Sequence, residues 1–194
     1  MEYRIGREGL FERLGAWDGF LKRKIHLIAF GGTALTIAGI KPSTKDIDLL
    51  VPDTGEYKYL VNILTQLGYK SASGSGWARS NGFIFDLFRG KRVHTTELLD
   101  SPLNKGNNIP VKEFNHIYLG VLNHYDILIS KLFRSASIDI DDCTALMRAK
   151  KADIDIKRFI ERFKETASYN ISEEKMNGNL DNFLKILKKE GFVW

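Results

Sequence analysis

The chain has 194 residues, 43% of them hydrophobic, which suffices to bury a core in one domain or in one domain with a small appendage. No apolar run approaches the roughly 18 residues of a membrane span, and the N-terminus lacks the apolar stretch of a signal peptide. A single cysteine, Cys143, excludes an internal disulfide, so we expect a cytoplasmic protein without membrane contact. Lys and Arg outnumber Asp and Glu by 29 to 24, and this net charge of +5 weakly favours an anionic partner such as a nucleotide or RNA.

The first predicted element is an amphipathic helix over residues 6–24. Leu10, Leu14, Trp17 and Leu21 fall on one stripe of this helix. We expect the stripe to pack against the core and to carry no chemistry.

The next stretch, residues 27–51, is predicted to organise the fold. Its expected parts, in chain order, are a strand over 27–30, a turn at Gly31 and Gly32, a helix over 33–39 and a strand over 46–51. Side chains alternate between the faces of a strand, so Asp46 and Asp48 should share one face. Two carboxylates on one face repel each other unless a cation lies between them. A Gly-Gly turn at the start of a helix suits a phosphate. We therefore expect a divalent metal and a phosphate group here.

A helix is predicted over 54–67, with Thr54 as its N-cap, and a hairpin follows. Asn81-Gly82 separates two apolar runs and is a strong hairpin signal. Asp86 lies in the second run, on the same face as Ile84 and Phe88. It is expected to join the Asp46–Asp48 carboxylates if the two strands are neighbours; the alternative is an edge-strand carboxylate that faces solvent.

The rest of the chain is predicted to be irregular over 92–110, to hold one strand within 112–122, centred on 114–119, and to be helical from residue 123 onward. We expect an α/β fold with a small mixed sheet flanked by helices and an all-helical C-terminal half. The expected boundary separates residues 1–122 from residues 123–194. Lysines and arginines on the later helices are expected to be solvated, with RNA binding as the alternative.

These motifs resemble the nucleotidyltransferase superfamily that includes DNA polymerase beta. The resemblance rests on Gly31-Gly32-Thr33-Ala34-Leu35, on Ser43-Thr44-Lys45-Asp46-Ile47-Asp48, and on Asp86. The unbroken Gly-Gly-Thr-Ala-Leu is similar to the branch that contains the AbiEii-type toxins of toxin–antitoxin systems. Lys131-Leu-Phe-Arg134 and Asp139-Ile-Asp-Asp142 match the downstream helices of that branch. Lys41 stands where AbiEii-like proteins often have an arginine, and a lysine lacks the bidentate fork.

The resemblance implies transfer of a nucleoside monophosphate from an NTP to an acceptor hydroxyl. Asp46, Asp48 and Asp86 would bind Mg²⁺ or Mn²⁺, and Asp86 would help to deprotonate the acceptor. Further residues are implied in the site: Gly31, Gly32, the Thr33 hydroxyl, Lys45 and Arg134 as nucleotide-binding groups, and Lys131 and Asp142 as catalytic ones. Lys131 could also be an ordinary exposed lysine, Asp142 could anchor it, and Asp139 is expected to be an N-cap or structural residue.

Three functions follow from these residues. The first is nucleotidyl transfer to RNA, such as the 3′ end of tRNA, with a cognate antitoxin as a possible partner. The second is the same transfer to a hydroxyl of a protein or of a small molecule such as an aminoglycoside. The third is a catalytically weak nucleotide-binding or antitoxin-type module, which the presence of all three carboxylates disfavours.

Overall fold

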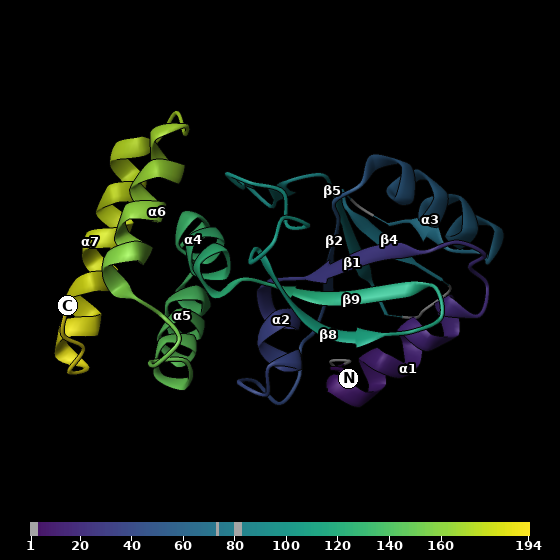
Figure 1. The fold of residues 1–194 in the computed structure, drawn as a ribbon, viewed down its shortest axis with the longest axis horizontal. Coiled ribbons are helices and arrows are strands. Elements are labelled where there is room, and N and C mark those ends of the chain that lie inside the picture. Colours follow the sequence, from purple (N-terminus) through teal and green to yellow (C-terminus); the bar gives the residue numbers. More distant parts are fainter. Residues whose placement is uncertain (1–3, 73, 80–82) are drawn as a thin grey trace. The chain divides into compact units, whose positions relative to one another are not determined.

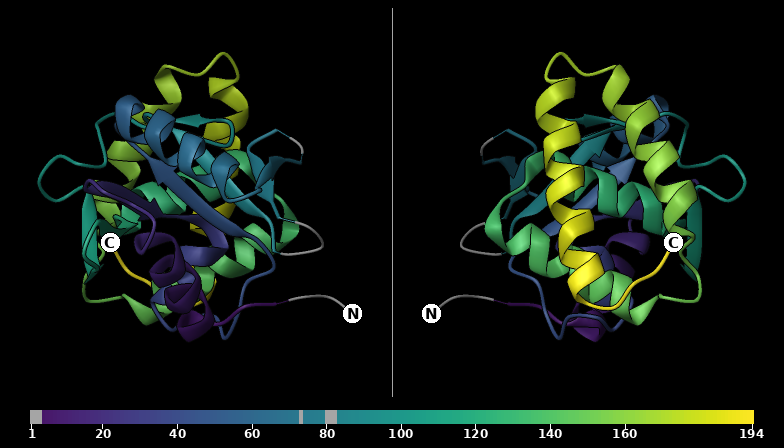
Figure 2. Two further views of the ribbon diagram at one scale, coloured as in Figure 1. Left: turned by 90° about the vertical axis from the view of Figure 1, so that its right-hand side faces the viewer. Right: turned by 90° about the vertical axis from the view of Figure 1, so that its left-hand side faces the viewer.

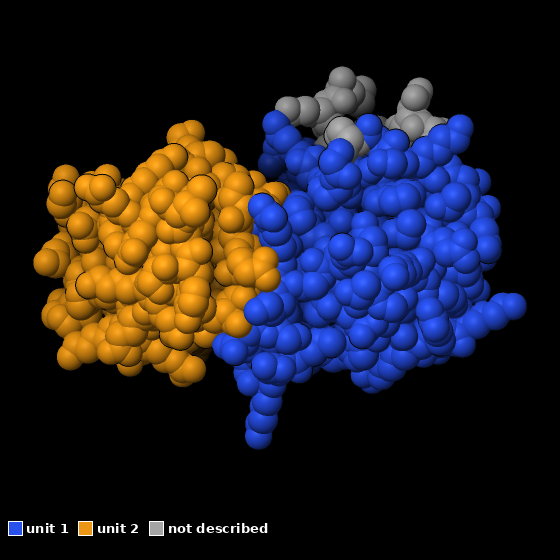
Figure 3. All heavy atoms as spheres, turned by 90° about the horizontal axis from the view of Figure 1, so that it is seen from above, with its two compact units in different colours: residues 1–93, 100–123 blue, residues 94–99, 124–194 orange. Residues whose placement is uncertain are grey.

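The computed structural model describes residues 4–72, 74–79 and 83–194, and the chain folds into two compact units (Figure 3). Unit 1 comprises Met1–Val93 and Asp100–Asn123, and unit 2 comprises His94–Leu99 and His124–Trp194. Each unit buries its own set of large apolar side chains, among them Phe30 and Phe85 in unit 1 and Phe159 and Phe183 in unit 2.

Unit 1 is built on a mixed sheet, whose described part has seven strands in the order β3-β4-β5-β2-β1-β9-β8 (Figure 1). The strands are β1 (Ile25–Ala29), β2 (Ile47–Val51), β3 (Lys70–Ser71), β4 (Gly76–Ala78), β5 (Phe85–Arg89), β8 (Asn108–Glu113) and β9 (Ile117–Leu122). Strand β1 pairs antiparallel with β2 and parallel with β9. β2 and β5 are also parallel, so both strands begin at the same end of the sheet. Polar residues at the start of these two strands therefore lie at that end.

The helices of unit 1 are α1 (Arg7–Asp18), α2 (Gly31–Ile37) and α3 (Thr54–Gln66). The predicted packing role of α1 is confirmed, since Leu10, Leu14 and Trp17 are all buried. The helix ends at Asp18, however, and does not continue to residue 24. The N-cap of α3 is Asp53, whose side chain accepts from the Glu56 N–H at 2.8 Å, so Thr54 is the first helical residue and not the cap.

Asp18, the last residue of α1, connects this helix to the sheet. Its carboxylate, only 5% exposed, accepts hydrogen bonds from three successive backbone N–H groups at the start of β9. The distances are 3.2 Å from Asn115, 2.6 Å from His116 and 3.0 Å from Ile117. The end of α1 is thereby joined to the start of a strand about a hundred residues later in the chain.

The prediction for residues 92–122 was partly wrong. The segment expected to be irregular contains β6 (Arg92–Val93) in unit 1, β7 (Thr96–Glu97) in unit 2 and the start of β8. Two strands, β8 and β9, replace the single one expected. β8 is the edge strand of the sheet, so its sequence NIPVKE is polar and contains Pro110, which hides the strand from a hydrophobicity pattern.

Unit 2 confirms the predicted helical C-terminal half. Its helices are α4 (His124–Arg134), α5 (Ser137–Ala149), α6 (Ile156–Ser168) and α7 (Glu173–Lys189). α4 contacts the other three helices, and α6 and α7 lie side by side (Figure 2). Edge-to-face aromatic pairs join Phe133 to Phe163 at 5.2 Å and Phe159 to Phe183 at 6.4 Å between ring centroids.

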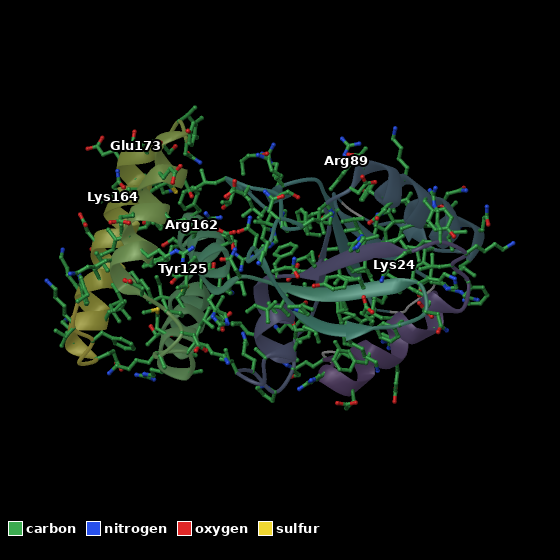
Figure 4. The ribbon with its side chains drawn as sticks, in the orientation of Figure 1. Lys24, Arg89, Tyr125, Arg162, Lys164 and Glu173 are labelled. Atoms are coloured by element: carbon green, nitrogen blue, oxygen red, sulfur yellow. The ribbon has the colours of Figure 1, made fainter. Side chains whose placement is uncertain are left out.

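A buried ion pair fixes α6 to α4 in this unit. Arg162, labelled in Figure 4, donates through Nε to Asp126 Oδ1 at 2.7 Å and through Nη2 to Asp126 Oδ2 at 3.0 Å. Such a bidentate pair specifies orientation as well as proximity. No helix in the described ranges of either unit is long and apolar enough to cross a membrane.

Candidate active site

Two glycines allow the start of α2 to approach the side chains of Asp48 and Thr44. Gly31 has φ +58°, and a Cβ added to it would lie 2.8 Å from Asp48 Oδ2. A Cβ on Gly32 would lie 2.9 Å from Thr44 Oγ1. These glycines are the first residues of α2, with Phe30 as N-cap, and not a turn that precedes the helix. Any side chain at Gly31 would occupy the place of a predicted site carboxylate.

The hydroxyl of Thr33 connects α2 to the start of β2. It donates to the Asp46 carbonyl at 3.1 Å and accepts from the Asp48 N–H at 2.9 Å, and Thr33 is fully buried. Thr44, which the sequence analysis did not single out, donates a second hydrogen bond to the Asp46 carbonyl at 2.9 Å. The Thr33 hydroxyl therefore fixes the backbone that joins Asp46 to Asp48. A phosphate contact by this hydroxyl would require one of these bonds to break.

Asp46 itself lies outside β2, in a bend that precedes the strand. The predicted strand over 46–51 therefore began one residue too early. The alternation of side chains between the two faces of a strand applies to Asp48 but not to Asp46. Asp46 and Lys45 are both exposed. The carbonyl of Asp46 is fixed, and its carboxylate is presented to solvent.

Asp86 lies directly beside Asp48. The two residues are register partners on the parallel strands β2 and β5. Since β5 lies between β4 and β2, the alternative of an edge-strand carboxylate is wrong. Ser75 donates to Asp86 Oδ1 at 2.7 Å. The sequence gives no signal for Ser75, because the pairing of β4 with β5 that brings it to Asp86 cannot be read from Gly74-Ser75-Gly76. The Asn81-Gly82 turn predicted for this hairpin lies outside the described residues.

The donor chemistry of this site suits a hard divalent cation. Asp48 and Asp86 offer carboxylate oxygens from neighbouring strands, and Gly31 leaves space against one of those oxygens. Within residues 4–72, 74–79 and 83–194, no three His, Cys, Asp or Glu side chains already form a group that could hold a metal. The Asp48–Asp86 pair fits a metal that also takes oxygens from a bound phosphate.

A second charged cluster lies in unit 2 and contains Lys131. The Lys131 ammonium donates to Asp142 Oδ2 at 2.7 Å and to Asp139 Oδ1 at 3.1 Å. The side chain is 3% exposed, so the alternative of an ordinary exposed lysine is wrong. Lys131 is paired with two buried carboxylates from α5.

Arg134 completes this cluster by a bidentate contact with Asp139. Its Nε donates to Oδ2 at 2.8 Å and its Nη2 donates to Oδ1 at 2.6 Å. Asp139 is not the N-cap of α5, which is Ala136, but it accepts from the Ala136 N–H at 3.1 Å. Burial by itself raises the pKa of Asp139, but the Arg134 hydrogen bonds and the Lys131 charge outweigh it and hold that pKa below its ordinary value. Cys143 is a buried core residue, and burial raises the pKa of its thiol.

A mixed sheet flanked by helices and followed by a helical region is the architecture predicted for a nucleotidyltransferase. Residues 19–190 match the family described as "Nucleotidyltransferase of unknown function (DUF6036)". This match covers most of the chain, and the protein belongs to that family. The predicted superfamily is thereby confirmed, and the protein is a nucleotidyltransferase.

Solved structures with similar folds are distant in sequence. A putative nucleotidyltransferase, TM1012 from Thermotoga maritima, is 14% identical with a TM-score of 0.41, over 81% of this chain and 96% of that chain. ANT(2″)-Ia in complex with adenylyl-2″-tobramycin is 16% identical with a TM-score of 0.46, over 92% of this chain and 97% of that chain. Comparison with curated proteins gives no match.

Proposed function

We propose that the protein transfers a nucleoside monophosphate from an NTP to an acceptor hydroxyl and releases pyrophosphate, with its reaction centre at Asp48 and Asp86. The observation that supports this most directly is the register of β2 and β5, which makes these two residues neighbours beside the Gly31 backbone. Asp46, which is exposed and directly precedes β2, would add a third carboxylate to those of Asp48 and Asp86.

Each group of the site has a role in the proposed reaction. The acceptor oxygen bonds to the α-phosphorus, the bond to pyrophosphate breaks, and Asp86 takes the acceptor proton while Ser75 holds its carboxylate in place. Asp46, Asp48 and Asp86 would hold Mg²⁺ or Mn²⁺, which when bound offsets the charge of the attacking and leaving oxygens. The backbone N–H groups of Gly31 and Gly32 and the Lys45 ammonium would bind the triphosphate.

The proposal gives the Lys131 cluster of unit 2 a role apart from the reaction centre. Lys131 and Asp142 were predicted to be catalytic and Arg134 to bind the nucleotide. Two cations and two carboxylates lie together there, and Lys131 already makes two ion pairs. We infer a positioning role for Lys131 and Asp142, which hold α4 and α5 together. Arg134 holds Asp139 through two of its nitrogens, and its side chain is 39% exposed; contact with a phosphate of the nucleotide remains its proposed role.

The proposed acceptor is RNA, with the 3′ end of tRNA as the form suggested by the AbiEii-type resemblance, which would also imply a cognate antitoxin. The net charge of +5 supports a polyanionic acceptor. A protein or small-molecule hydroxyl is the alternative, and a catalytically weak binding module is the third function.

A label-transfer assay distinguishes these functions. The protein is incubated with Mg²⁺, each α-labelled NTP and a cell extract, and the products are separated into RNA, protein and small molecules. We expect label in RNA, reduced about 100-fold or more by Asp86→Asn, which removes the base, and also lost in Asp48→Asn. Asp181→Asn, which changes an exposed carboxylate on α7, is the matched control and should leave transfer unchanged. Label in another fraction would favour the second function, and Mg²⁺-dependent NTP binding without any transfer would contradict the enzymatic proposal.

A further inference from the structure

Two adjoining grooves cross the surface of unit 1 at the C-terminal half of α3. The first, of about 330 Å³, is lined by Phe20, Lys22, Arg23, Tyr59, Ile63, Gln66 and Leu67. The second, of about 650 Å³, is lined by Gln66, Leu67, Gly68, Lys70, Ser71, Ala72, Ala78 and Arg79. Both are lined by Gln66 and Leu67, so the two grooves adjoin at these residues, and together they are here called the α3 groove.

The α3 groove carries charge of one sign. Lys22, Arg23, Lys70 and Arg79 line it and are exposed, and no Asp or Glu is among its lining residues. In the described part of the chain, none of these four cations forms an ion pair, unlike the neighbouring Lys24, which pairs with Glu113 at 3.0 Å. A groove with four uncompensated cations attracts a polyanion.

Aromatic rings stand beside these cations. Phe20 is 56% exposed, so its ring is accessible to a ligand. The Tyr59 hydroxyl accepts from the Lys22 N–H at 2.8 Å, and the Arg23 guanidinium lies 4.0 Å from the centroid of the Tyr59 ring. Arg23 and Tyr59 thus form a cation–π contact in the same groove as the exposed Phe20 ring.

We propose that the α3 groove binds single-stranded RNA. A cationic groove that follows the phosphates, combined with aromatic faces on which bases stack, is the combination that recognises single strands without strict sequence preference. Gln66 and Ser71 add neutral hydrogen-bonding groups at the middle of the groove, of the kind that contact a ribose 2′-hydroxyl.

The part of the α3 groove around Arg23 is separate from the proposed reaction centre. None of its lining residues is Gly31, Asp48 or Asp86, and Arg23 precedes the five-residue strand β1 whereas Gly31 follows it. A strand of this length spans about 16 Å. If the proposed function is correct, the groove would hold the acceptor strand at a distance from its reacting end. The binding itself does not depend on that function.

Binding is measured by fluorescence anisotropy of the full chain with a fluorescein-labelled uridine decamer, without NTP or divalent cation. With four phosphate contacts, log affinity should fall with log salt at a slope of about −2.8. Arg23→Gln with Lys70→Gln should reduce the magnitude of that slope by about 1.4. The matched control, Lys58→Gln with Lys105→Gln, removes the same charge from exposed lysines of unit 1 outside the groove and should leave the slope unchanged.

Phe20→Ala tests stacking, and it should weaken RNA binding about fivefold or more at constant charge. Because Phe20 is exposed, the variant should fold, and circular dichroism checks this. Equal effects of the groove and control pairs, no effect of Phe20→Ala, equal or tighter binding of a thymidine DNA decamer, or equal binding of a glutamate decamer would each overturn the proposal. Asp48→Asn should retain RNA binding, so a failure of transfer and a failure of the groove are distinguishable.

Discussion

Gly31 and Gly39 both have positive φ angles, +58° and +73°, but their surroundings differ. An added Cβ meets the Asp48 carboxylate at Gly31 and nothing within 4 Å at Gly39. Alanine in this conformation costs about 1–2 kcal/mol at either position. Gly31→Ala should in addition displace Asp48 and reduce transfer about 100-fold, whereas Gly39→Ala should reduce only stability. Urea unfolding and the label-transfer assay measure the two effects, and equal activity of both variants would contradict the proposed role of Gly31.

Thr33 and Thr36 offer a second comparison on α2. Both are buried, but the Thr33 hydroxyl makes two hydrogen bonds to the start of β2, and the Thr36 hydroxyl has no hydrogen-bond partner in the described structure. Thr33→Val should lower the free energy of unfolding by about 1–3 kcal/mol, because it leaves the Asp48 N–H unpaired. Thr36→Val should be neutral or stabilising. Urea unfolding measures both, and Thr33→Ser should restore most of the loss; a Thr36→Val loss as large as that of Thr33→Val would contradict this account.

At the scale of single residues, the sequence identifies groups that stand out by type. Asp48 and Asp86 interrupt apolar runs, and a Gly-Gly pair before a helix is rare enough to notice. Ser75 and Thr44 could not be predicted, because serine and threonine are common in loops. Their importance comes from strand pairing and loop geometry, which depend on residues distant in the sequence.

At the scale of elements, the Lys131 cluster joins α4 to α5. Lys131→Met removes a buried ammonium that pairs with the buried carboxylates of Asp139 and Asp142, and it should destabilise the protein by about 3–5 kcal/mol. Lys150→Met is the matched control, since Lys150 makes only a part-exposed pair with Asp153 at 3.8 Å and should cost at most about 1 kcal/mol. Thermal and urea unfolding compare them. A loss for Lys131→Met no larger than that of the control would show that the cluster does not stabilise unit 2.

The stability that the Lys131 cluster contributes depends on pH, because Asp139 titrates. Its pKa in the folded protein lies below the ordinary value of 3.8, so folding favours the ionised form. The stability from this group is complete above about pH 4 and is lost as the pH falls through the folded-state pKa. The difference in unfolding free energy between wild type and Asp139→Asn should therefore be constant from pH 5 to pH 7, to within roughly the error of the measurement, and shrink in more acidic solution. A difference that grows on acidification would contradict this assignment.

The helices were the most predictable elements, because their apolar residues recur at helical spacing and are buried in the fold. Leu180, Phe183 and Leu187 on α7 show this directly. β8 was missed for the opposite reason: an edge strand with polar residues and a proline has no apolar face to reveal it. β6 and β7, with two residues each, are too short to leave any pattern.

At the scale of the whole molecule, we propose that the predicted boundary between residues 1–122 and 123–194 separates two cooperative units. Phe183→Ala, at a fully buried position of unit 2, should cost about 3–5 kcal/mol there. In a Trp194→Phe background, Trp17 and Trp77 report on unit 1 alone. The urea transition seen by far-UV circular dichroism should move to lower concentration while the tryptophan transition stays in place. Equal shifts of both transitions would contradict the proposal.

The Asp18 carboxylate has a consequence for synthesis on the ribosome. Its partners on Asn115, His116 and Ile117 are translated 97 to 99 residues after it. At 5–20 residues per second, this interval lasts roughly 5–20 s. During that time β1 has no β9 to pair with, and the backbone of Ile25 and Leu27 is open to strands of other chains. The nascent protein should therefore depend on chaperones until residue 122 has left the exit tunnel.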